Sequence, residues 1–374
     1  MLSMERAPVS VVVREWGRIG FVGFGGPPVH VALLRDLCVE RRGWMSAREF
    51  EDANAACGLL PGPASTQLAI YCARRAGGLA GALLGGLAFI LPGLVMLIAL
   101  AAVALSDEPP SWIRAVGAGA AAAVVAVVVQ AGLVLAGSSL GGLGGARLAR
   151  AVAYVAAGAA ATVLAGVGVV IVLLACGLIE LHVRRRPRDQ PAAAHVATLP
   201  ALVWMAFKVG ALSYGGGYVI IPLMQADAVD AYGWMTRSEF VDAVAYGQLT
   251  PGPVVQTVAA VGYAASGLGG ALLAAAVAFS PSFLIILVGG RRFERLRTSV
   301  RARAFLDGAG PAAVGAILGA AVPLAAGIEE AWQYAVLAVA ALALAAQRPA
   351  ILALVGGALA GLLALALGAP LPSN

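Results

Sequence analysis

Long apolar runs, separated by short polar or basic segments, follow one another along this chain of 374 residues. Many of the runs reach the length of about 20 residues that a helix needs to cross the hydrocarbon core of a bilayer. The runs lie at 11–34, 50–73, 78–105, 113–136, 151–181, 199–224, 239–264, 267–290, 305–326, 331–346 and 349–368. Long polar–apolar alternation, the mark of a membrane β-barrel, is missing. The pattern predicts an all-α polytopic membrane protein with about 10–12 spans.

The two halves of the pattern repeat at a constant offset of 190 positions, as between Pro61 and Pro251. Gly43-Trp44-Met45 matches Gly233-Trp234-Met235 at this offset. Further along, Ala122-Ala123-Val124 still matches Ala312-Ala313-Val314, without a gap. Such a register indicates a duplication. We therefore expect an N-terminal repeat at 1–181, a basic linker at 182–198 and a C-terminal repeat at 199–374.

Basic residues between the runs predict how the two halves are oriented. Arg74-Arg75 in the first half corresponds to an uncharged segment, 264–268, in the second. Because basic loops stay on the cytoplasmic side, equivalent loops that differ in this way are expected on opposite sides of the membrane. This predicts inverted-topology repeats whose broken helices meet near the membrane midplane. The number of crossings between 151 and 224 stays open, because inversion needs an odd number per half.

A proline–glycine–proline (PGP) motif interrupts one apolar run in each half, as Pro61-Gly62-Pro63 and as Pro251-Gly252-Pro253. Prolines lack an N–H and collide with the preceding turn, so the helix breaks here. We expect it to restart with Pro63 or Pro253 as its first residue. The next N–H groups, Ala64 to Gln67 and Val254 to Thr257, would then be free and form an anion site. Matched breaks inside two membrane repeats predict the binding site of a transporter.

A second pair of glycine-rich breaks lies upstream at corresponding positions. Gly25-Gly26-Pro27, close to His30, forms the first, and Gly215-Gly216-Gly217 forms the second. An opened helix exposes backbone groups to a ligand, whereas the alternative is a tight helix crossing built from small residues. His30 could carry a proton, or it could bond a carbonyl group that the break has freed.

Two cations also occupy corresponding positions in the halves. Lys208 is the lone charge of the run Leu199 to Ala226, and its equivalent in the first half is Arg18. A charge inside a span is costly and indicates function. The two side chains could flank one anion. Alternatively, either of them extends along its helix to reach a lipid headgroup.

Acids and uncharged polar residues surround the PGP motifs. Glu49 and Glu239 fit capping boxes with Ser46 and Thr236, and Asp52 and Asp242 follow one turn later. These four acids are either proton-coupling groups or ordinary first-turn acids that suit the helix dipole. The remaining candidates for substrate binding are Asn54, Ser65, Thr66, Gln67, Gln248, Thr250, Gln256 and Thr257.

The composition agrees with a membrane transporter and excludes other classes. Hydrophobic residues make up 61% of the chain and charged residues 12%, against about 25% charged in a soluble domain. The net charge of +6 reflects basic loops and not a nucleic-acid surface. Four scattered cysteines and three distant histidines indicate no metal site, and we expect no cofactor.

Taken together, the motifs resemble the chromate ion transporter family in its long, two-domain form, over nearly the whole chain. The resemblance implies an inner-membrane carrier that exports chromate, driven by the proton gradient, and confers chromate resistance. It also implies duplicated halves in opposite orientation. The residues that carry it are Gly23-Phe24-Gly25-Gly26-Pro27-Pro28-Val29-His30, Glu40-Arg41-Arg42-Gly43-Trp44, Glu49-Phe50, Leu60-Pro61-Gly62-Pro63, Tyr214-Gly215-Gly216-Gly217-Tyr218, Thr250-Pro251-Gly252-Pro253 and Phe279-Ser280-Pro281-Ser282-Phe283.

Chromate is a tetrahedral dianion, and half-helix N-termini together with Lys208 and Arg18 could supply its donors and cations. The expected partners are this oxyanion, protons and the lipid bilayer, with no nucleic acid; a homodimer is one option for the assembly. Sulfate or another oxyanion is the alternative substrate, and a passive anion channel is the alternative mode.

A membrane enzyme that acts on lipid is the remaining rival class. It would need a nucleophile–base pair or a metal cluster inside the spans. Ser65, Ser213, Thr250 and His30 are available but show no recognisable catalytic spacing. We therefore expect a transporter and not an enzyme.

Overall fold

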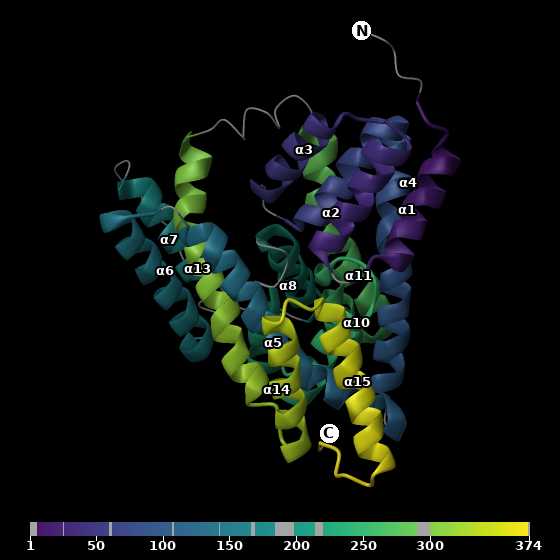
Figure 1. The fold of residues 1–374 in the computed structure, drawn as a ribbon, viewed down its shortest axis with the longest axis vertical. Coiled ribbons are helices and arrows are strands. Elements are labelled where there is room, and N and C mark those ends of the chain that lie inside the picture. The colour runs from purple at the N-terminus through teal and green to yellow at the C-terminus, as the bar shows by residue number, and fades with distance from the viewer. Residues whose placement is uncertain are drawn as a thin grey trace.

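The computed structural model describes residues 6–24, 26–59, 62–106, 108–141, 143–165, 169–183, 198–213, 220–289 and 300–372. Every regular element in these ranges is helical, as the apolar runs predicted (Figure 1). The first half contains α1 (Val9–Val22), α2 (Pro27–Arg35), η1 (Asp36–Arg41), α3 (Ala47–Leu59), α4 (Ala64–Ala104), α5 (Ser111–Leu140), α6 (Gly145–Ala165) and α7 (Val169–Val183). The second half contains α8 (Thr198–Leu212), α9 (Ile220–Gln225), η4 (Ala226–Ala231), α10 (Arg237–Leu249), η5 (Val254–Thr257), α11 (Val258–Gly289), α13 (Val300–Ala325), α14 (Ala331–Ala345) and α15 (Ala350–Ala366).

Five helices in the described ranges are long and apolar enough to cross a membrane: Ala64–Ala104, Ser111–Gly137, Gly145–Leu164, Val254–Leu287 and Asp307–Ala325. Four shorter apolar helices cover Ile171–Leu181, Leu199–Leu212, Ala331–Ala345 and Ala350–Ala366. Five predicted runs are divided: 11–34 into α1 and α2, 50–73 into α3 and α4, 151–181 into α6 and α7, 199–224 into α8 and α9, and 239–264 into α10, η5 and α11. Fewer unbroken spans therefore result than the apolar runs alone indicate.

α4 and α11 each consist of two limbs that fold back on one another. Gly78 in α4 has a φ of 69° and Gly267 in α11 a φ of 57°, values that suit glycine and interrupt a regular helix. The limbs then approach closely through small residues. A Cβ atom on Gly81 would lie 2.6 Å from the Ala73 carbonyl oxygen, and one on Gly262 would lie 2.4 Å from that of Gly270.

Corresponding elements of the two halves begin and end at corresponding residues. Adding 190 to the bounds of α3, 47 and 59, gives 237 and 249, the bounds of α10. The same addition to 36 and 41, the bounds of η1, gives 226 and 231, the bounds of η4. η1 and η4 are π-helical segments, which are rare and often accompany functional sites. The two halves thus share one local fold over this part of the chain.

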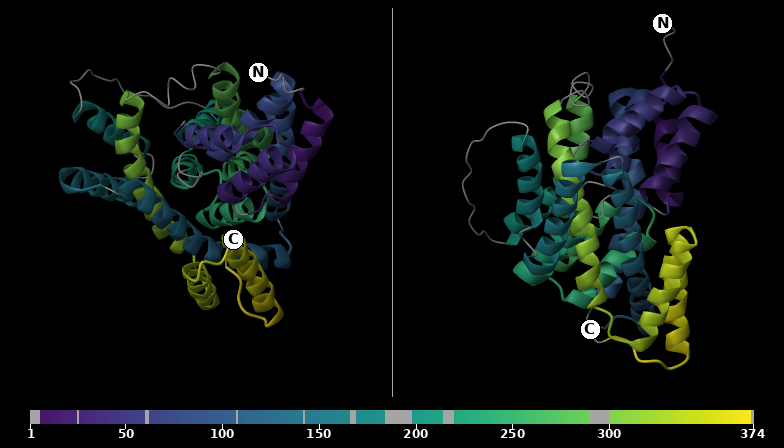
Figure 2. Two further views of the ribbon diagram at one scale, coloured as in Figure 1. Left: turned by 45° about the horizontal axis from the view of Figure 1, so that its top comes forward. Right: turned by 60° about the vertical axis from the view of Figure 1, so that its left-hand side comes forward.

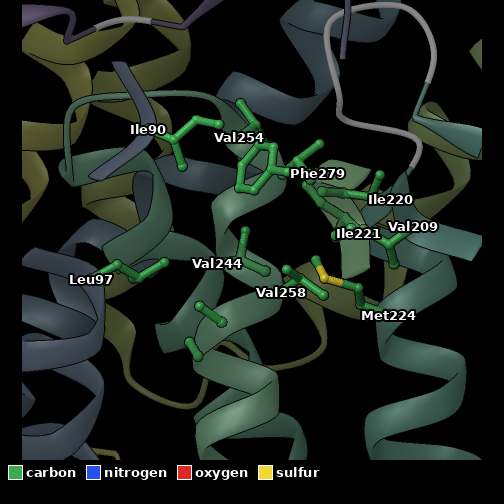
Figure 3. Close-up of a cluster of buried hydrophobic side chains, with 14 of the residues drawn as sticks. Ile90, Leu97, Val209, Ile220, Ile221, Met224, Val244, Val254, Val258 and Phe279 are labelled. Carbon is green, nitrogen blue, oxygen red and sulfur yellow. The ribbon is translucent and has the colours of Figure 1, made fainter. Parts of the chain in front are cut away.

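A buried apolar core forms where α4 of the first half meets α8 to α11 of the second. Figure 3 shows Val254 next to the Phe279 ring, with Val244 and Val258 between Leu97 and Met224; all of these side chains are buried. A glycine tightens the contact between α8 and α11, because a Cβ atom on Gly210 would lie 2.0 Å from the Ala278 carbonyl oxygen. This packing holds the ends of the broken helices in place.

The remaining helices lie around this core. α13 packs along α6 and α7 at one side, and α14 and α15 pack against α5 (Figures 1 and 2). Large apolar side chains face outward on these helices; Leu164 is 83% exposed and Leu342 is 70% exposed. An apolar exterior of this kind suits lipid, which offers no hydrophobic penalty to such side chains.

Candidate functional site

Both PGP motifs break the chain as the sequence predicts. α3 ends at Leu59 and α4 begins at Ala64, while α10 ends at Leu249 and η5 begins at Val254. Gly62 and Gly252 take matching positive φ angles, 114° and 115°. The restart differs by one residue from the prediction: Pro63 and Pro253 have extended ψ angles of 104° and 137° and precede the first helical residue. Each proline is therefore the cap of its helix.

The breaks of one half are hydrogen-bonded to the breaks of the other. The Gly62 N–H donates to the Ser213 carbonyl oxygen at 3.0 Å, and the Gly252 N–H donates to the Gly23 carbonyl oxygen at 3.2 Å. Gly62 and Gly252 are 190 positions apart, and so are Gly23 and Ser213. We call this pair of bonds the crossed link. It brings each PGP break next to the residue that follows the first helix of the other half, Ser213 after α8 and Gly23 after α1.

The free N–H groups after the breaks are fewer than predicted. The Gln67 N–H donates to the Pro63 carbonyl oxygen at 3.0 Å, so only Ala64 to Thr66 have no acceptor within their helix. In the second half the Gln256 N–H donates to the Pro253 carbonyl oxygen at 2.9 Å. The reason is that η5 is a 3₁₀ turn, in which bonding starts one residue earlier.

Four buried polar atoms near the crossed link have no hydrogen-bond partner among the described residues: Thr66 Oγ1, Ser213 Oγ, Gln256 Oε1 and Ser282 Oγ. Thr66 and Gln256 are equivalent residues of the two halves. Ser282 Oγ lies beside the first break, 3.2 Å from the place where a Cβ atom on Gly62 would be. A buried polar atom left unpaired costs about 1–3 kcal/mol, so a group of them indicates a place that a ligand fills.

His30 bonds a carbonyl group of the crossed link. Its Nε2 lies 2.9 Å from the Gly23 carbonyl oxygen, and its Nδ1 lies 3.3 Å from Ser65 Oγ. Because a carbonyl oxygen only accepts, Nε2 carries the proton and Nδ1 is left to accept from the serine hydroxyl. The Phe89 ring packs edge-on at 5.0 Å. Of the two interpretations of His30, the geometry favours the one in which it satisfies a freed carbonyl.

The two predicted cations have different surroundings. Lys208 is buried, and its Nζ lies 2.6 Å from Asp227 Oδ2 and 2.9 Å from Asp227 Oδ1. It also lies over the Trp204 ring at 5.8 Å. Arg18 is exposed. The structure therefore does not pair the two cations, and Asp227 already offsets the charge of Lys208. Asp227 was detectable in the sequence as the next charged residue after Lys208.

The acids ahead of the motifs also differ between the halves. Thr236 and Glu239 form a complete capping box, with Thr236 N to Glu239 Oε2 at 2.6 Å and Glu239 N to Thr236 Oγ1 at 3.2 Å. Glu49 N donates to Ser46 Oγ at 3.2 Å, but the Glu49 carboxylate turns to Arg75 Nε at 2.6 Å. Asp52 and Asp242 are both half-buried.

The other predicted residues are distributed as follows. Gln256 Nε2 donates to Thr250 Oγ1 at 2.9 Å and to the Pro251 carbonyl oxygen at 3.0 Å, which holds the second break in shape. Thr257 Oγ1 donates to the Val254 carbonyl oxygen at 2.8 Å. Gly26 caps α2 and Pro27 begins it. Gln67 and Gln248 are buried, and Asn54 is half-buried. Gly25, Pro61 and Gly215 to Gly217 lie outside the described residues.

Two further buried carboxylates were not indicated by the sequence. Glu15 on α1 pairs with Arg42 at 2.5 Å, and Arg42 in turn lies over the Trp44 ring at 5.6 Å. Glu180 on α7 accepts two bonds from Arg150, each of 3.1 Å, and one from the Tyr154 hydroxyl at 3.1 Å. Both carboxylates are fully engaged in ties between elements, which is a structural role.

Comparison with known proteins gives the geometry its context. The sequence matches the chromate transporter family over residues 11–181 and 200–362. The chain belongs to the chromate transporter family. The two matched segments correspond to the two halves, so this is the long, two-domain form. As a member of this family it is a multi-pass membrane transporter and not an enzyme.

Similar proteins come from several bacteria. A chromate transport protein of Cupriavidus metallidurans is 34% identical over 82% of this chain and 80% of its own. A probable chromate transport protein of Synechococcus elongatus is 30% identical over 82% of each chain. A chromate transport protein of Pseudomonas aeruginosa is 30% identical over 82% of this chain and 79% of its own. No solved structure matches the chain.

Proposed function

We propose that the protein exports chromate across the bacterial inner membrane by secondary transport coupled to the proton gradient, and thereby confers chromate resistance. The ion is taken from the relatives, because two of them are named as chromate transport proteins and one as a probable chromate transport protein. The observation that carries the proposal is the crossed link with its unpaired polar atoms. A carrier needs such a site, shared between two halves that can move against each other.

The chemistry of the site suits a tetrahedral oxyanion. Thr66, Ser213 and Ser282 can each donate a hydroxyl hydrogen bond, and the first turn of α4 adds backbone N–H groups. A helix N-terminus contributes only about half a positive charge, so these donors recognise the ion more than they neutralise it. Weak neutralisation favours a transporter, because a site that bound the dianion too tightly would not release it.

We further propose that the halves, 1–181 and 199–374, are inverted repeats joined by the basic linker 182–198. The reciprocal bonds of the crossed link join equivalent residues of the two halves, as a two-fold axis between the halves requires. In inverted repeats this axis lies in the membrane plane, so the crossed link would lie near the midplane. The basic residues Arg74 and Arg75 favour a cytoplasmic position for the junction between the two limbs of α4, next to which they lie.

Uptake of chromate into everted membrane vesicles tests the proposal. Accumulation that needs a proton gradient and collapses with an uncoupler is the expected result. Vesicles without the protein serve as the control. Chromate accumulation that is unchanged by the uncoupler would contradict proton coupling.

The same measurement separates the alternatives. Equilibration without accumulation would indicate a passive channel, because a channel cannot concentrate its ion. Accumulation of labelled sulfate in preference to chromate would assign the site to another oxyanion. Sulfate competition at equal concentration measures this preference directly.

A further inference from the structure

A polar cavity lies where the start of α5 meets the start of α10. It is a partly open hollow of about 550 Å³ including its mouth, and its polar lining comes chiefly from Arg114 on α5 and from Glu239, Asp242 and Tyr246 on α10. A second hollow of about 350 Å³ shares Arg114 and Asp242 and extends to Gln333 and Pro372. The two hollows are adjacent because they share lining residues, and together we call them the α5–α10 cavity.

Arg114 is the only basic residue that lines the described part of this cavity. It stands in the first turn of α5, where the helix dipole already places positive charge, so the helix itself gains nothing from a cation there. Its Nη2 donates to the Pro372 carbonyl oxygen at 2.7 Å. Among the described residues no carboxylate oxygen lies within the 4.0 Å of an ion pair with it. The guanidinium thus keeps donors available to a ligand in the cavity.

One face of α10 connects the cavity to the second PGP break. Glu239, Asp242, Tyr246 and Thr250 follow at intervals of three and four residues, which puts them in one row on a helix. The Thr250 hydroxyl donates to the Tyr246 carbonyl oxygen at 3.0 Å, and the Tyr246 hydroxyl donates to the Ile113 carbonyl oxygen at 3.2 Å. In the first half the row is Glu49, Asp52, Ala56, so it loses its polar character before the break. Of the two equivalent helices, α10 therefore carries a polar row up to its PGP break and α3 does not.

We propose that the α5–α10 cavity is an access site for the transported oxyanion, in which Arg114 binds a tetrahedral dianion and Asp242 controls that binding through its protonation state. This inference rests on the proposed function. The dianion would take the place that the Pro372 carbonyl now occupies on the guanidinium. In export the dianion would reach the cavity from the crossed link along the α10 row and leave the protein there.

The charges around Asp242 determine how protonation acts. The groups that face it are Arg114 from α5 and Glu239 and the Tyr246 phenol from α10. From α14 and the C-terminal tail the described lining residues are Gln333 and Pro372, which carry no side-chain charge. An ionised Asp242 repels a dianion and attracts Arg114. A protonated Asp242 does neither, so oxyanion binding becomes tighter as the pH falls through the titration of Asp242.

Chromate transport by Arg114→Gln, Arg114→Lys and Asp242→Asn proteins in right-side-out vesicles, where the cavity faces the added chromate, tests the proposal. Arg348→Gln is the control for an exposed arginine outside the cavity. Arg114→Gln should raise the KM for chromate about tenfold or more, since a charged hydrogen bond is lost, and leave the maximal rate within about twofold. Arg114→Lys should have a KM for chromate between those of Arg114→Gln and the wild type. Asp242→Asn should continue to transport but lose the pH dependence of KM. Arg348→Gln should match wild type.

Two results would overturn the proposal: an unchanged KM in Arg114→Gln, or a wild-type pH dependence of KM in Asp242→Asn. A fall in the amount of folded protein with KM unchanged would assign Arg114 to stability alone. Equilibrium binding of labelled chromate to the purified variants repeats the comparison without transport. Chromate transport by the wild-type protein tests the proposed export independently of Arg114. A wild-type protein that binds chromate through Arg114 but does not move it would refute export and keep the site.

Discussion

Thr66 and Thr257 are two buried threonines, three and four residues after their PGP prolines, with opposite hydrogen-bond states. Thr66 Oγ1 has no partner in the described part of the chain, whereas Thr257 Oγ1 donates to the Val254 carbonyl oxygen. A valine at each position removes the hydroxyl and keeps the shape. This gives a matched pair of variants that separates binding from stability.

We expect Thr66→Val to weaken chromate binding about tenfold and to raise stability without ligand, because an unpaired buried hydroxyl is removed. Thr257→Val should leave the chromate affinity unchanged and lower stability by about 0.5–1.5 kcal/mol, the contribution of one hydrogen bond. Equilibrium chromate binding measures the affinities, and thermal unfolding in detergent measures the stabilities. Equal chromate affinities of the two variants would show that Thr66 does not contribute to the binding site.

Lys208 and Asp227 form a buried pair, which makes single replacements ambiguous. Lys208→Met leaves the Asp227 carboxylate buried without its partner, which costs about 3–5 kcal/mol. We expect this variant to be poorly folded in the membrane, and Lys208→Met combined with Asp227→Asn to recover the wild-type amount of protein. Membrane yield and thermal unfolding measure the recovery.

The double variant then decides the role of Lys208. If it is well folded but inactive, Lys208 acts on the ion. If it transports chromate at the wild-type rate, the pair only ties α8 to η4. A single Lys208→Met variant as stable as wild type would contradict the pairing itself.

For single residues, the sequence predicted the motifs of the site better than it predicted which side chains contact one another. The glycines and prolines of the breaks were identifiable because few residue types produce a break inside an apolar run. Ser282, Asp227 and Arg114 were not singled out as site residues, since each gains its significance from a neighbour that is distant in the chain. Arg18 and Lys208 occupy equivalent positions, yet only Lys208 is buried, because Asp227 has no acidic counterpart at Leu37.

Among the elements, the second limb of α4 depends on a glycine where it meets the second PGP break. A Cβ atom on Gly93 would lie 1.7 Å from the Pro251 carbonyl oxygen and 2.6 Å from Gln256 Oε1. The first of these is a backbone atom that cannot turn aside. The close approach therefore fixes the position of the break relative to α4.

We expect Gly93→Ala to destabilise the protein by at least about 1–3 kcal/mol, the usual cost of overpacking, and to abolish transport in the folded fraction. Gly356→Ala on α15 is the control, because nothing lies within 4 Å of the added methyl group. A glycine in a helix interior costs about 0.5–1 kcal/mol relative to alanine, so Gly356→Ala should be neutral or stabilising. Thermal unfolding distinguishes the two variants. Equal unfolding temperatures for Gly93→Ala and Gly356→Ala would refute the close contact between Gly93 and Pro251.

Element boundaries were predictable where local chemistry sets them. The restart after each PGP motif came within one residue. The division of α4 and α11 into two limbs was also predicted, because one apolar run ends at 73 or 264 and the next begins at 78 or 267. The close packing of the two limbs, as between Gly81 and Ala73, is a tertiary feature that the runs did not predict.

For the whole molecule, inverted topology predicts that equivalent exposed residues face opposite sides of the membrane. Ala47 and Arg237 begin α3 and α10, are equivalent, and are both exposed. The native cysteines are buried, so they give little background. In intact cells a membrane-impermeant maleimide should label Arg237→Cys and not Ala47→Cys, and everted vesicles should give the reverse. Labelling of both from one side would show that the halves are parallel.

The crossed link also has a consequence for synthesis of the protein. The N-terminal half leaves the ribosome first. Its Gly62 N–H then lacks the acceptor at 213, whereas the Gly23 carbonyl has His30 Nε2 and lacks only its second donor at 252. In lipid, each unpaired backbone group costs several kcal/mol. The nascent first half is therefore incomplete until the start of the second half, with Ser213 and Gly252, has been inserted. A chain cut short by premature termination in between would be a natural substrate for membrane quality control.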